Sequence, residues 1–239
     1  MIESDLAEVK KLLDSGRKVA GLLAPVIGEV EEILRKAGFA YTAAIKDEAQ
    51  KMAGLERRAW TEREKDRDLF LTSSCPVIAD MIRSRYPAIA PCLSATPSPM
   101  ALAAEKIRKR DPESVLVFIG PCHEKKWEKR PGSIETAVDY ALQPETLAVL
   151  LKDRGICMEP EELCRDQHEE DELGGKGGIV AVMRSVIPEG DSGAPRYASY
   201  AGLEECRRFL EEVMGGKHRG EYVELSACAG GCYGRLRNH

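Results

Sequence analysis

The sequence predicts an α/β fold in which two lobes of mostly parallel β-sheet are flanked by helices. Three observations support this prediction. Short apolar runs alternate with segments of helical periodicity, and the run SVLVFI at 114–119 is typical of a strand buried in a parallel sheet. The 239 residues are enough for one large or two small domains. A charged connector at 61–68 (TEREKDRD) marks an expected boundary between the lobes of a single domain, 1–239.

The expected helices are identified by apolar residues at helical spacing and by their end signals. In the first helix, Ser4 is expected as the N-cap, and apolar residues from Leu6 to Leu13 share one face. Gly38 is expected to close the second helix. In chain order, the expected helices are an opening helix from residue 4, then 26–37, 44–67, 77–85, 97–110, 144–152, 178–184 and 202–213.

The expected strands are short apolar runs that end at Pro, Gly or polar residues. They are 18–23, 69–72, 114–119, 137–142 and 221–225. Because they alternate with helices, most of them are expected to pair in parallel through helical crossovers.

The composition excludes several classes of function. There are 35 Lys and Arg residues against 40 Asp and Glu, a net charge of −5, which argues against a nucleic-acid partner. No apolar run reaches the ~18 residues that a membrane helix needs. The N-terminus, MIESDLAEVKK, lacks the apolar core of a signal peptide. We therefore expect a cytoplasmic protein with no membrane span.

Four of the eight cysteines follow expected strands, where ligands gather in open α/β sheets. They are Cys75, Cys122, Cys228 and Cys232. Thiolates at four points suit an iron–sulfur cluster or tetrahedral zinc, and both alternatives stay open on this chemistry. Gly230 and Gly231 are expected to let the backbone approach the bound group, since they have no Cβ.

The remaining cysteines and the nearby histidines are interpreted as structural. Cys92, Cys157, Cys164 and Cys206 are expected to act as small hydrophobic residues. His123 and His168 are expected at the surface. Lys125 is different, because a buried lysine three residues after Cys122 would face a negatively charged ligand.

Three segments together resemble the signature motifs of the catalytic domain of iron-only (FeFe) hydrogenases. The family motifs read roughly TSCCPxW, MPCxxKxxE and ExMxCxxGC. The corresponding segments here, in the same order, are TSSCP at 72–76, GPCHEKKWE at 120–128 and ELSACAGGC at 224–232. The resemblance implies the α/β fold of the C-terminal domain of the iron-only hydrogenase large subunit, with a metal cluster between the two lobes.

The resemblance also implies an H-cluster. Cys75, Cys122, Cys228 and Cys232 would hold a 4Fe–4S cluster, and Cys232 would bridge it to a two-iron unit that carries CO, cyanide and a bridging dithiolate. Lys125 would donate a hydrogen bond to a cyanide, a strong charge-assisted contact, and Glu128 would support that lysine. The implied cofactor pocket is lined by Ala24, Pro25, Ser94, Gly120, Pro121 and Ser226.

Three departures from the family pattern indicate slow turnover. Ser74 stands where enzymatic members carry the cysteine that relays protons, and an alcohol is a far weaker acid than a thiol. Gly120 and Ser226 stand where the motifs carry methionines. The region before the first motif, which supplies proton-path carboxylates in enzymes, looks shortened. This combination resembles sensory or minimal members, which bind the cofactor and oxidise H2 slowly and reversibly (2 H⁺ + 2 e⁻ = H2).

The resemblance implies several partners. H2 and protons would be the substrates, and an external ferredoxin-like protein or a fused domain would exchange electrons. Dedicated maturation proteins would assemble the two-iron unit. The alternative function is a 4Fe–4S electron-transfer or iron–sulfur assembly protein without that unit. The serine at position 74 argues against a third hypothesis, an efficient hydrogenase.

Overall fold

The computed structural model describes residues 2–63, 69–72, 74–129, 133–164, 172–187 and 193–236. The chain divides into two compact units, each built from two separate stretches. Unit 1 consists of Met1–Asp47 and Met100–Glu170, and unit 2 consists of Glu48–Pro99 and Asp171–His239. The expected boundary at 61–68 coincides with none of these limits. Residues 61–63 belong to unit 2, and 64–68 lie outside the described residues.

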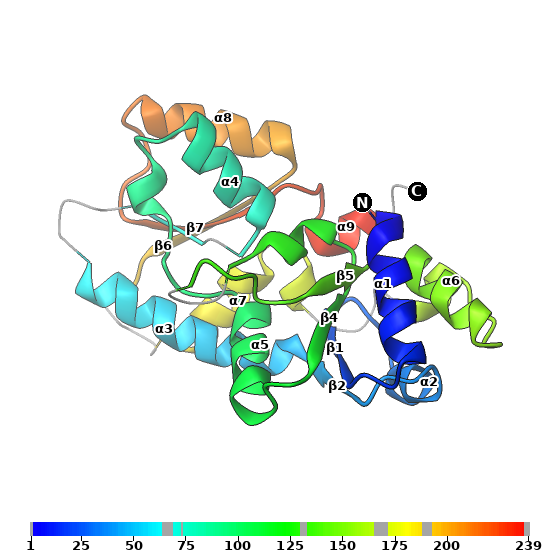
Figure 1. Cartoon of the computed structure of the whole chain (residues 1–239). Helices are drawn as coiled ribbons and strands as arrows, with labels where there is room; N and C mark the ends of the chain where they lie inside the picture. The colour runs from blue at the N-terminus through cyan, green and yellow to red at the C-terminus, as the bar shows by residue number, and fades with distance from the viewer. Residues whose placement is uncertain are drawn as a thin grey trace. The chain divides into compact units, whose positions relative to one another are not determined.

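Unit 1 contains a four-stranded sheet in the order β2-β1-β4-β5 (Figure 1). Every neighbouring pair in it is parallel, as the alternation of strands and helices predicted. The strands are β1 (Val19–Leu23), β2 (Tyr41–Ala44), β4 (Val115–Ile119) and β5 (Tyr140–Leu142).

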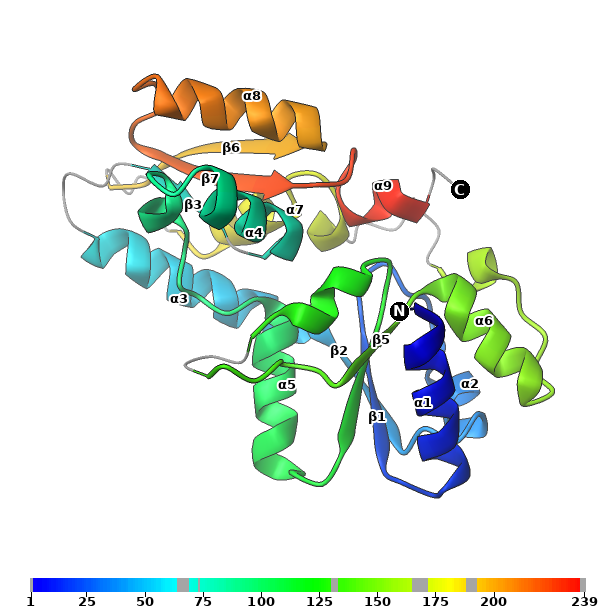
Figure 2. The same ribbon diagram turned by 45° about the horizontal axis from the view of Figure 1, so that its top comes forward.

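Helices lie on both faces of this sheet. Figure 2 shows α5 on one side, with α1 and α6 on the other. The helices are α1 (Ile2–Asp14), α2 (Glu31–Lys36), α5 (Pro99–Arg110) and α6 (Pro144–Asp153), with short 3-10 turns η1 (Ile45–Glu48), η3 (His123–Trp127) and η4 (Pro160–Leu163). Among the described residues, no helix is both long and apolar enough to cross a membrane.

Unit 2 contains a three-stranded parallel sheet in the order β3-β7-β6. Its strands are β3 (Leu69–Leu71), β6 (Arg196–Ala201) and β7 (Glu221–Ser226). Figure 1 shows α4 and α8 on one face of this sheet, and α3 and α7 on the other. The helical elements are α3 (Ala49–Glu62), α4 (Pro76–Arg85), α7 (Gly178–Ser185), α8 (Leu203–Met214) and α9 (Cys232–Leu236), with η2 (Ala90–Cys92) and η5 (Glu172–Gly174).

Side chains of the central strand β7 alternate between two packed layers, as the pleat of a strand requires. Val223 and Leu225 pack with the apolar side chains of α4 and α8. Tyr222 points to the opposite face, where its ring stacks on Phe70 at 5.5 Å. Glu224, two residues further on, lies on this second face as well and contacts α7. A carboxylic acid is therefore buried in the layer between the sheet and α7.

The predicted elements are present, with some corrected limits. The first helix begins at Ile2, so Ser4 lies inside it and is not its N-cap. The second helix is only Glu31–Lys36, because Ile27 and Gly28 pair with the Leu163–Cys164 segment. The fourth strand of unit 1 begins at Tyr140 rather than at 137. Strands β2 and β6 were not predicted.

Candidate functional site

In unit 1, the loops that follow the strands meet at one edge of the sheet. The Ala24 N–H, just after β1, donates to the Ile119 carbonyl at 2.9 Å. The Gly120 N–H, just after β4, donates to the Leu142 carbonyl at the end of β5, at 3.1 Å. The carboxyl ends of three neighbouring strands therefore lie together, the place where ligands bind in open α/β sheets.

Gly120 and Pro121 are held tightly in this edge. A Cβ added at Gly120 would lie 2.6 Å from the Cβ of Ala24 and 2.6 Å from the Phe118 ring, so no side chain fits there without movement of both neighbours. The Pro121 carbonyl accepts a hydrogen bond from the buried Gln143 amide at 3.1 Å. Of the predicted pocket residues, Ala24 and Gly120 are thus in contact, and Pro121 follows directly.

Cys122 precedes a short turn that places a lysine and a glutamate together. In η3, the Lys125 Nζ lies 2.6 Å from Oε2 of Glu128. Their side chains are only 13% and 15% exposed. Residues three apart lie over one another in a 3-10 turn, which explains the pairing. The two residues predicted to act together are therefore joined by a largely buried ion pair.

The opposite side of η3 carries a second ionic contact that the sequence did not indicate. Asp5 of α1 is 1% exposed, and it accepts hydrogen bonds from Lys126 Nζ at 2.5 Å and from the Ala141 N–H at 3.1 Å. The His123 Nε2 lies 3.5 Å from the same carboxylate. His123 is buried, so the prediction of a surface histidine is wrong for this residue. His168 lies outside the described residues.

In unit 2, three of the four predicted cluster ligands follow the neighbouring parallel strands β3 and β7. Cys75 is the N-cap of α4, with Pro76 at the first helical position. Cys228 follows β7, and Cys232 begins α9. Cys75 and Cys228 are half-buried, whereas Cys232 is exposed. The three thiols therefore lie beyond the carboxyl ends of adjacent strands.

The two predicted serines near Cys75 have different surroundings. The Ser74 hydroxyl lies 3.6 Å from Sδ of Met52, a weak acceptor. Ser94 is buried, its N–H donates to the Leu71 carbonyl at 2.7 Å, and its Oγ accepts from the Thr96 N–H at 3.0 Å. Both serines are anchored near the end of β3.

A buried carboxylic acid that the sequence analysis missed contacts one of these serines. Glu56 of α3 hydrogen-bonds to Ser94 and accepts a hydrogen bond from the Tyr222 hydroxyl. Burial raises the pKa of Glu56 to about 7. The region before the first motif therefore does contain a carboxyl group able to hold and release a proton near neutral pH. Its position on the inner face of an amphipathic helix was the available signal.

Glu224, the first residue of the third motif, is also buried. Its carboxylate accepts hydrogen bonds from the backbone N–H groups of Val180, Ile179 and Gly177 at the start of α7. Burial nevertheless raises the pKa of Glu224 to about 7. Ser226, two residues further on, is half-buried and ends β7, and its carbonyl accepts from the Gly202 N–H at 2.9 Å.

The structure gives a different reason for the glycine at position 231. A Cβ there would lie 2.6 Å from the backbone carbon of Gly175 and 2.8 Å from the Lys176 nitrogen. The missing side chain makes room for the protein's own backbone, a contact that the sequence analysis did not indicate. A Cβ at Gly230 would meet only Gly234, at 3.5 Å.

Two of the cysteines predicted to be structural are held as thiols. The Cys206 thiol donates to the Ser226 carbonyl at 3.4 Å, and the Cys164 thiol donates to the Pro160 carbonyl at 3.3 Å. Burial raises the pKa of each to about 11. A thiol with so high a pKa stays protonated near neutral pH, as expected of a buried structural cysteine.

The described residues contain no group of three or more His, Cys, Asp or Glu side chains that is ready to hold one metal ion. Tetrahedral zinc with Zn–S bonds of about 2.3 Å needs its thiolates about 4 Å apart. The three thiols of unit 2 do not form such a group. A 4Fe–4S cluster makes a different demand, because each cysteine binds a separate iron.

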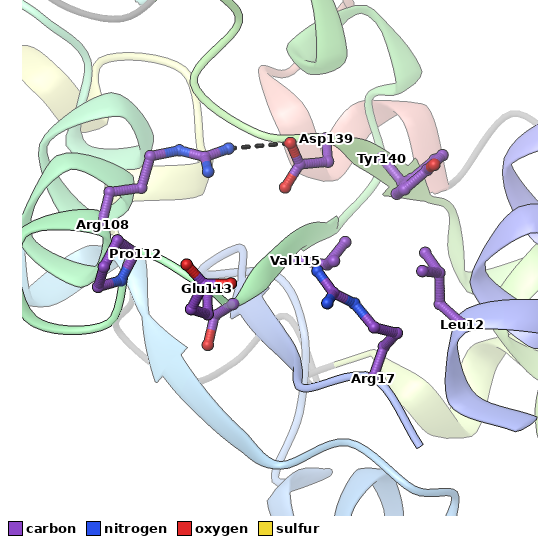
Figure 3. A pocket seen from close by; sticks show the side chains of 9 residues that line it. Leu12, Arg17, Arg108, Pro112, Glu113, Val115, Asp139 and Tyr140 are labelled. Atoms are coloured by element: carbon purple, nitrogen blue, oxygen red, sulfur yellow. Dashed lines mark hydrogen bonds and ion pairs between the residues drawn. The ribbon is translucent and has the colours of Figure 1, made fainter. Parts of the chain in front are cut away.

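A pocket of about 290 Å³ lies at the other edge of the unit 1 sheet, at the amino ends of the strands (Figure 3). It contains the Arg108–Asp139 ion pair, at 3.0 Å, and none of the predicted site residues. Ligands of open α/β sheets bind at the carboxyl ends, so this pocket is not the candidate site.

Comparison with known proteins agrees with this architecture. Residues 18–234 match the family described as iron only hydrogenase large subunit, C-terminal domain. No curated protein sequence shows significant similarity to the chain.

Several solved structures share the fold. A variant of FeFe-hydrogenase HydA1 from Chlamydomonas reinhardtii is 17% identical, with a TM-score of 0.69 over 98% of this chain and 83% of that chain. The apo form of another HydA1 variant from this alga is 18% identical, with a TM-score of 0.67 over 98% and 83%. An FeFe-hydrogenase whose structure concerns oxygen damage to the H cluster 2Fe subcluster is 19% identical, with a TM-score of 0.66 over 96% and 83%. Because the family match extends over residues 18–234, the chain belongs to the family formed by the C-terminal domains of iron-only hydrogenase large subunits.

Proposed function

We propose that this chain is an H-cluster domain of sensory or minimal type that binds H2 and oxidises it slowly and reversibly. Cys75, Cys122, Cys228 and Cys232 would hold a 4Fe–4S cluster, and Cys232 would also bind the two-iron unit. An external ferredoxin-like protein or a fused domain would exchange electrons, and maturation proteins would deliver the two-iron unit. The domain would work in the cytoplasm.

The observation that carries the proposal is the ion pair of Lys125 and Glu128. A largely buried ammonium group is costly unless its charge is compensated, and Glu128 provides compensation here. An anionic cyanide ligand would also accept a charge-assisted hydrogen bond from this lysine. A cluster protein without cyanide ligands would have little use for this lysine, so the pair favours the complete H-cluster.

The remaining residues fit roles in binding and proton transfer. When bound, the two-iron unit supplies the heterolytic cleavage of H2. The thiolates of unit 2 would fix the cluster at the ends of β3 and β7. Glu56, whose pKa burial raises to about 7, would hold a proton and share it with Ser94 through their hydrogen bond. The chain thus provides positioning and electrostatics around a reactive cofactor.

The slow, sensory character is supported by residues that are smaller or less acidic than those of the family motifs. The Ser74 hydroxyl, beside the weak acceptor Met52 Sδ, is a poor proton carrier. Gly120 cannot become a methionine without moving Ala24 and Phe118. Ala24 and the Phe118 ring occupy the space that a side chain at position 120 would need, which supports a site adapted to glycine there.

The proposal is tested by infrared spectroscopy on anaerobically purified, cluster-reconstituted protein after addition of a synthetic two-iron cofactor. We expect bands in the CO and cyanide region that shift under H2. In the Lys125→Gln variant, cofactor retention should fall by about tenfold or more, the effect of losing one charge-assisted hydrogen bond. Lys129→Gln, an exposed lysine on the same segment, is the matched control and should behave as the wild type.

Two outcomes would contradict the proposal. A blank infrared spectrum, with an intact 4Fe–4S signal by electron paramagnetic resonance, would leave an electron-transfer or iron–sulfur assembly protein. Equal retention by the wild type and by Lys125→Gln would remove the role assigned to that lysine.

A further inference from the structure

Glu224 is a buried acid whose described side-chain hydrogen bonds go to one feature, the start of α7. It projects from β7 and is 5% exposed. Its Oε2 accepts the Val180 N–H at 3.0 Å, and its carboxylate also accepts from Ile179 and Gly177. The first N–H groups of a helix have no partner within the helix, and a carboxylate is their strongest acceptor. Glu224 therefore ties β7 to the amino end of α7.

The amino end of α7 is continuous with a glycine-rich turn, Gly174–Gly178, which we call the glycine turn. Gly177 is the N-cap residue and has a φ of 84°, a conformation that favours glycine. Gly175 forms an isolated antiparallel bridge with Gly231. Gly231 has a φ of 80°, and a Cβ added to it would lie 2.6 Å from the backbone carbon of Gly175. The two backbones are in direct contact.

Gly231 lies in the segment Cys228–Cys232, which follows β7 directly. Its N–H donates to the Cys228 carbonyl at 3.0 Å, and its own carbonyl accepts from the Gly234 N–H at 3.1 Å. These contacts connect three segments to one another. β7 continues into the segment Cys228–Cys232, this segment contacts the glycine turn through Gly231, and the glycine turn is bonded to β7 through Glu224.

Burial of this carboxylate costs free energy, because desolvation opposes its charge and raises its pKa. Glu56 adds electrostatic repulsion from α3, and Tyr222 lies on the same face of β7. An apolar residue would avoid this cost but would leave the N–H groups of α7 without an acceptor. The presence of a glutamate at position 224 is therefore explained by the N–H groups of α7 that its carboxylate holds in place.

We infer that Glu224 is a positioning residue, which fixes the cysteine segment Cys228–Cys232 through the start of α7 and the glycine turn. The inference deepens the proposed function, because that segment would supply two cluster ligands. The inference predicts one specific effect. Removal of the Glu224 carboxylate should make local opening at Gly231 and Gly234 more frequent, although this carboxylate does not contact them directly.

The test is amide hydrogen exchange by NMR on the full chain without cluster, at pH 8, where Glu224 is charged. In Glu224→Gln, one acceptor oxygen is replaced by a donor. We expect the amides of Gly177, Ile179 and Val180 to exchange about tenfold faster or more, as loss of a bond to a charged group implies. The amides of Gly231 and Gly234 should also accelerate, while that of Thr72 on the Val223 carbonyl stays protected.

Glu205→Gln is the matched control. Glu205 also contacts the glycine turn, through the Lys176 side chain at 3.0 Å, but not the N–H groups of α7. We expect no change at Gly231 in this variant. If Glu224→Gln does not fold, Glu224→Asp keeps the charge with a shorter reach and should show the same pattern at smaller amplitude.

The inference is overturned if only the α7 amides accelerate while Gly231 and Gly234 keep wild-type rates, since Glu224 would then be only a helix cap. A second readout follows reconstitution of the 4Fe–4S cluster. Glu224→Gln should broaden its electron paramagnetic resonance signal, because the ligand segment adopts several positions, and an unchanged signal contradicts the positioning role. The exchange experiment needs no cofactor, so its result is independent of whether the proposed function holds.

Discussion

In unit 2, the side chains of Ser74 and Glu56 differ greatly in acidity. Glu56 has a pKa of about 7 because it is buried, and it hydrogen-bonds to Ser94 and Tyr222. Ser74, next to Cys75, carries only a hydroxyl. Of the described residues next to Cys75, the proposed cluster ligand, Ser74 is therefore a far weaker acid than Glu56.

Replacing that hydroxyl by a thiol should raise turnover. In the cofactor-loaded protein, we expect Ser74→Cys to increase the rate of H2 oxidation by about tenfold to hundredfold, within the range of a positioned acid or base. A gas-phase H2 assay with an artificial electron acceptor measures this rate. Ser84→Cys adds a thiol to an exposed position of α4 and should have no effect. Equal rates for Ser74→Cys and the wild type would show that proton relay at this position does not limit turnover.

At the scale of the elements, η3 is fixed from two sides. Glu128 holds its Lys125 face, and Asp5 from α1 holds its Lys126 face together with the N–H of Ala141 in β5. The turn that follows Cys122 is thereby tied to the first helix and to the edge strand of unit 1. Its position depends on a residue that lies more than 100 positions earlier in the chain.

Asp5→Asn should consequently destabilise the protein. It removes the charge that compensates Lys126, and breaking a buried ion pair costs about 3–5 kcal/mol. Because Lys126 is 20% exposed, we expect a loss of about 2–4 kcal/mol in the free energy of unfolding, measured by urea titration. Asp14→Asn, on the exposed end of the same helix, should cost less than about 1 kcal/mol. Similar losses in the two variants would contradict the role given to Asp5.

The sequence predicted elements well where one pattern decides them, and poorly where distant contacts decide. The run at 114–119 could only be a buried strand, and β4 confirms it. The helix expected at 26–37 is shorter because Ile27 and Gly28 pair with residues more than 130 positions away, which periodicity does not record. Strand β6 has no continuous apolar run, since it is an edge strand stabilised by pairing with β7.

The residues of the candidate site also divide into those that the sequence indicated and those whose surroundings depend on distant contacts. The family resemblance implied that Glu128 supports Lys125, and the structure contains this ion pair. The burial of His123 and Glu224 was not predictable, because each depends on a partner from another element, whereas Glu56 was signalled only by its place on the inner face of an amphipathic helix. The reason for Gly231 was also hidden, since its neighbour Gly175 is distant in sequence.

For the whole molecule, the two buried acids make stability depend on pH. The pKa values of Glu56 and Glu224 are raised from 4.5 to about 7 in the folded protein, so folding favours their neutral forms. Below pH 4.5 the two carboxyl groups are protonated in both the folded and the unfolded protein, and their contribution to the free energy of unfolding is fully present. As pH rises towards 7, the unfolded chain releases protons that the folded protein retains, and stability falls.

We therefore expect the free energy of unfolding to decrease by about 2–5 kcal/mol between pH 5 and pH 8, given 1.36 kcal/mol per pKa unit and some coupling between the acids. Thermal unfolding across this range measures the change. Glu56→Gln should flatten the profile by about half, because it removes one of the two titrating groups. A profile that rises with pH would show that these carboxyl groups are ionised at neutral pH in the fold.

The division of each unit into two separate stretches of chain also sets an order for biosynthesis. All four strands of the unit 1 sheet have been made once Leu142 is complete. Among the described strands, β7 is the sheet partner of β3, and it emerges some 150 residues later. During translation Cys75 is therefore attached to a strand without its sheet. The sheet of unit 2, which carries three of the four proposed cluster ligands, can be completed only after β7 has emerged, so the proposed cluster would be inserted after that late event rather than during the synthesis of unit 1.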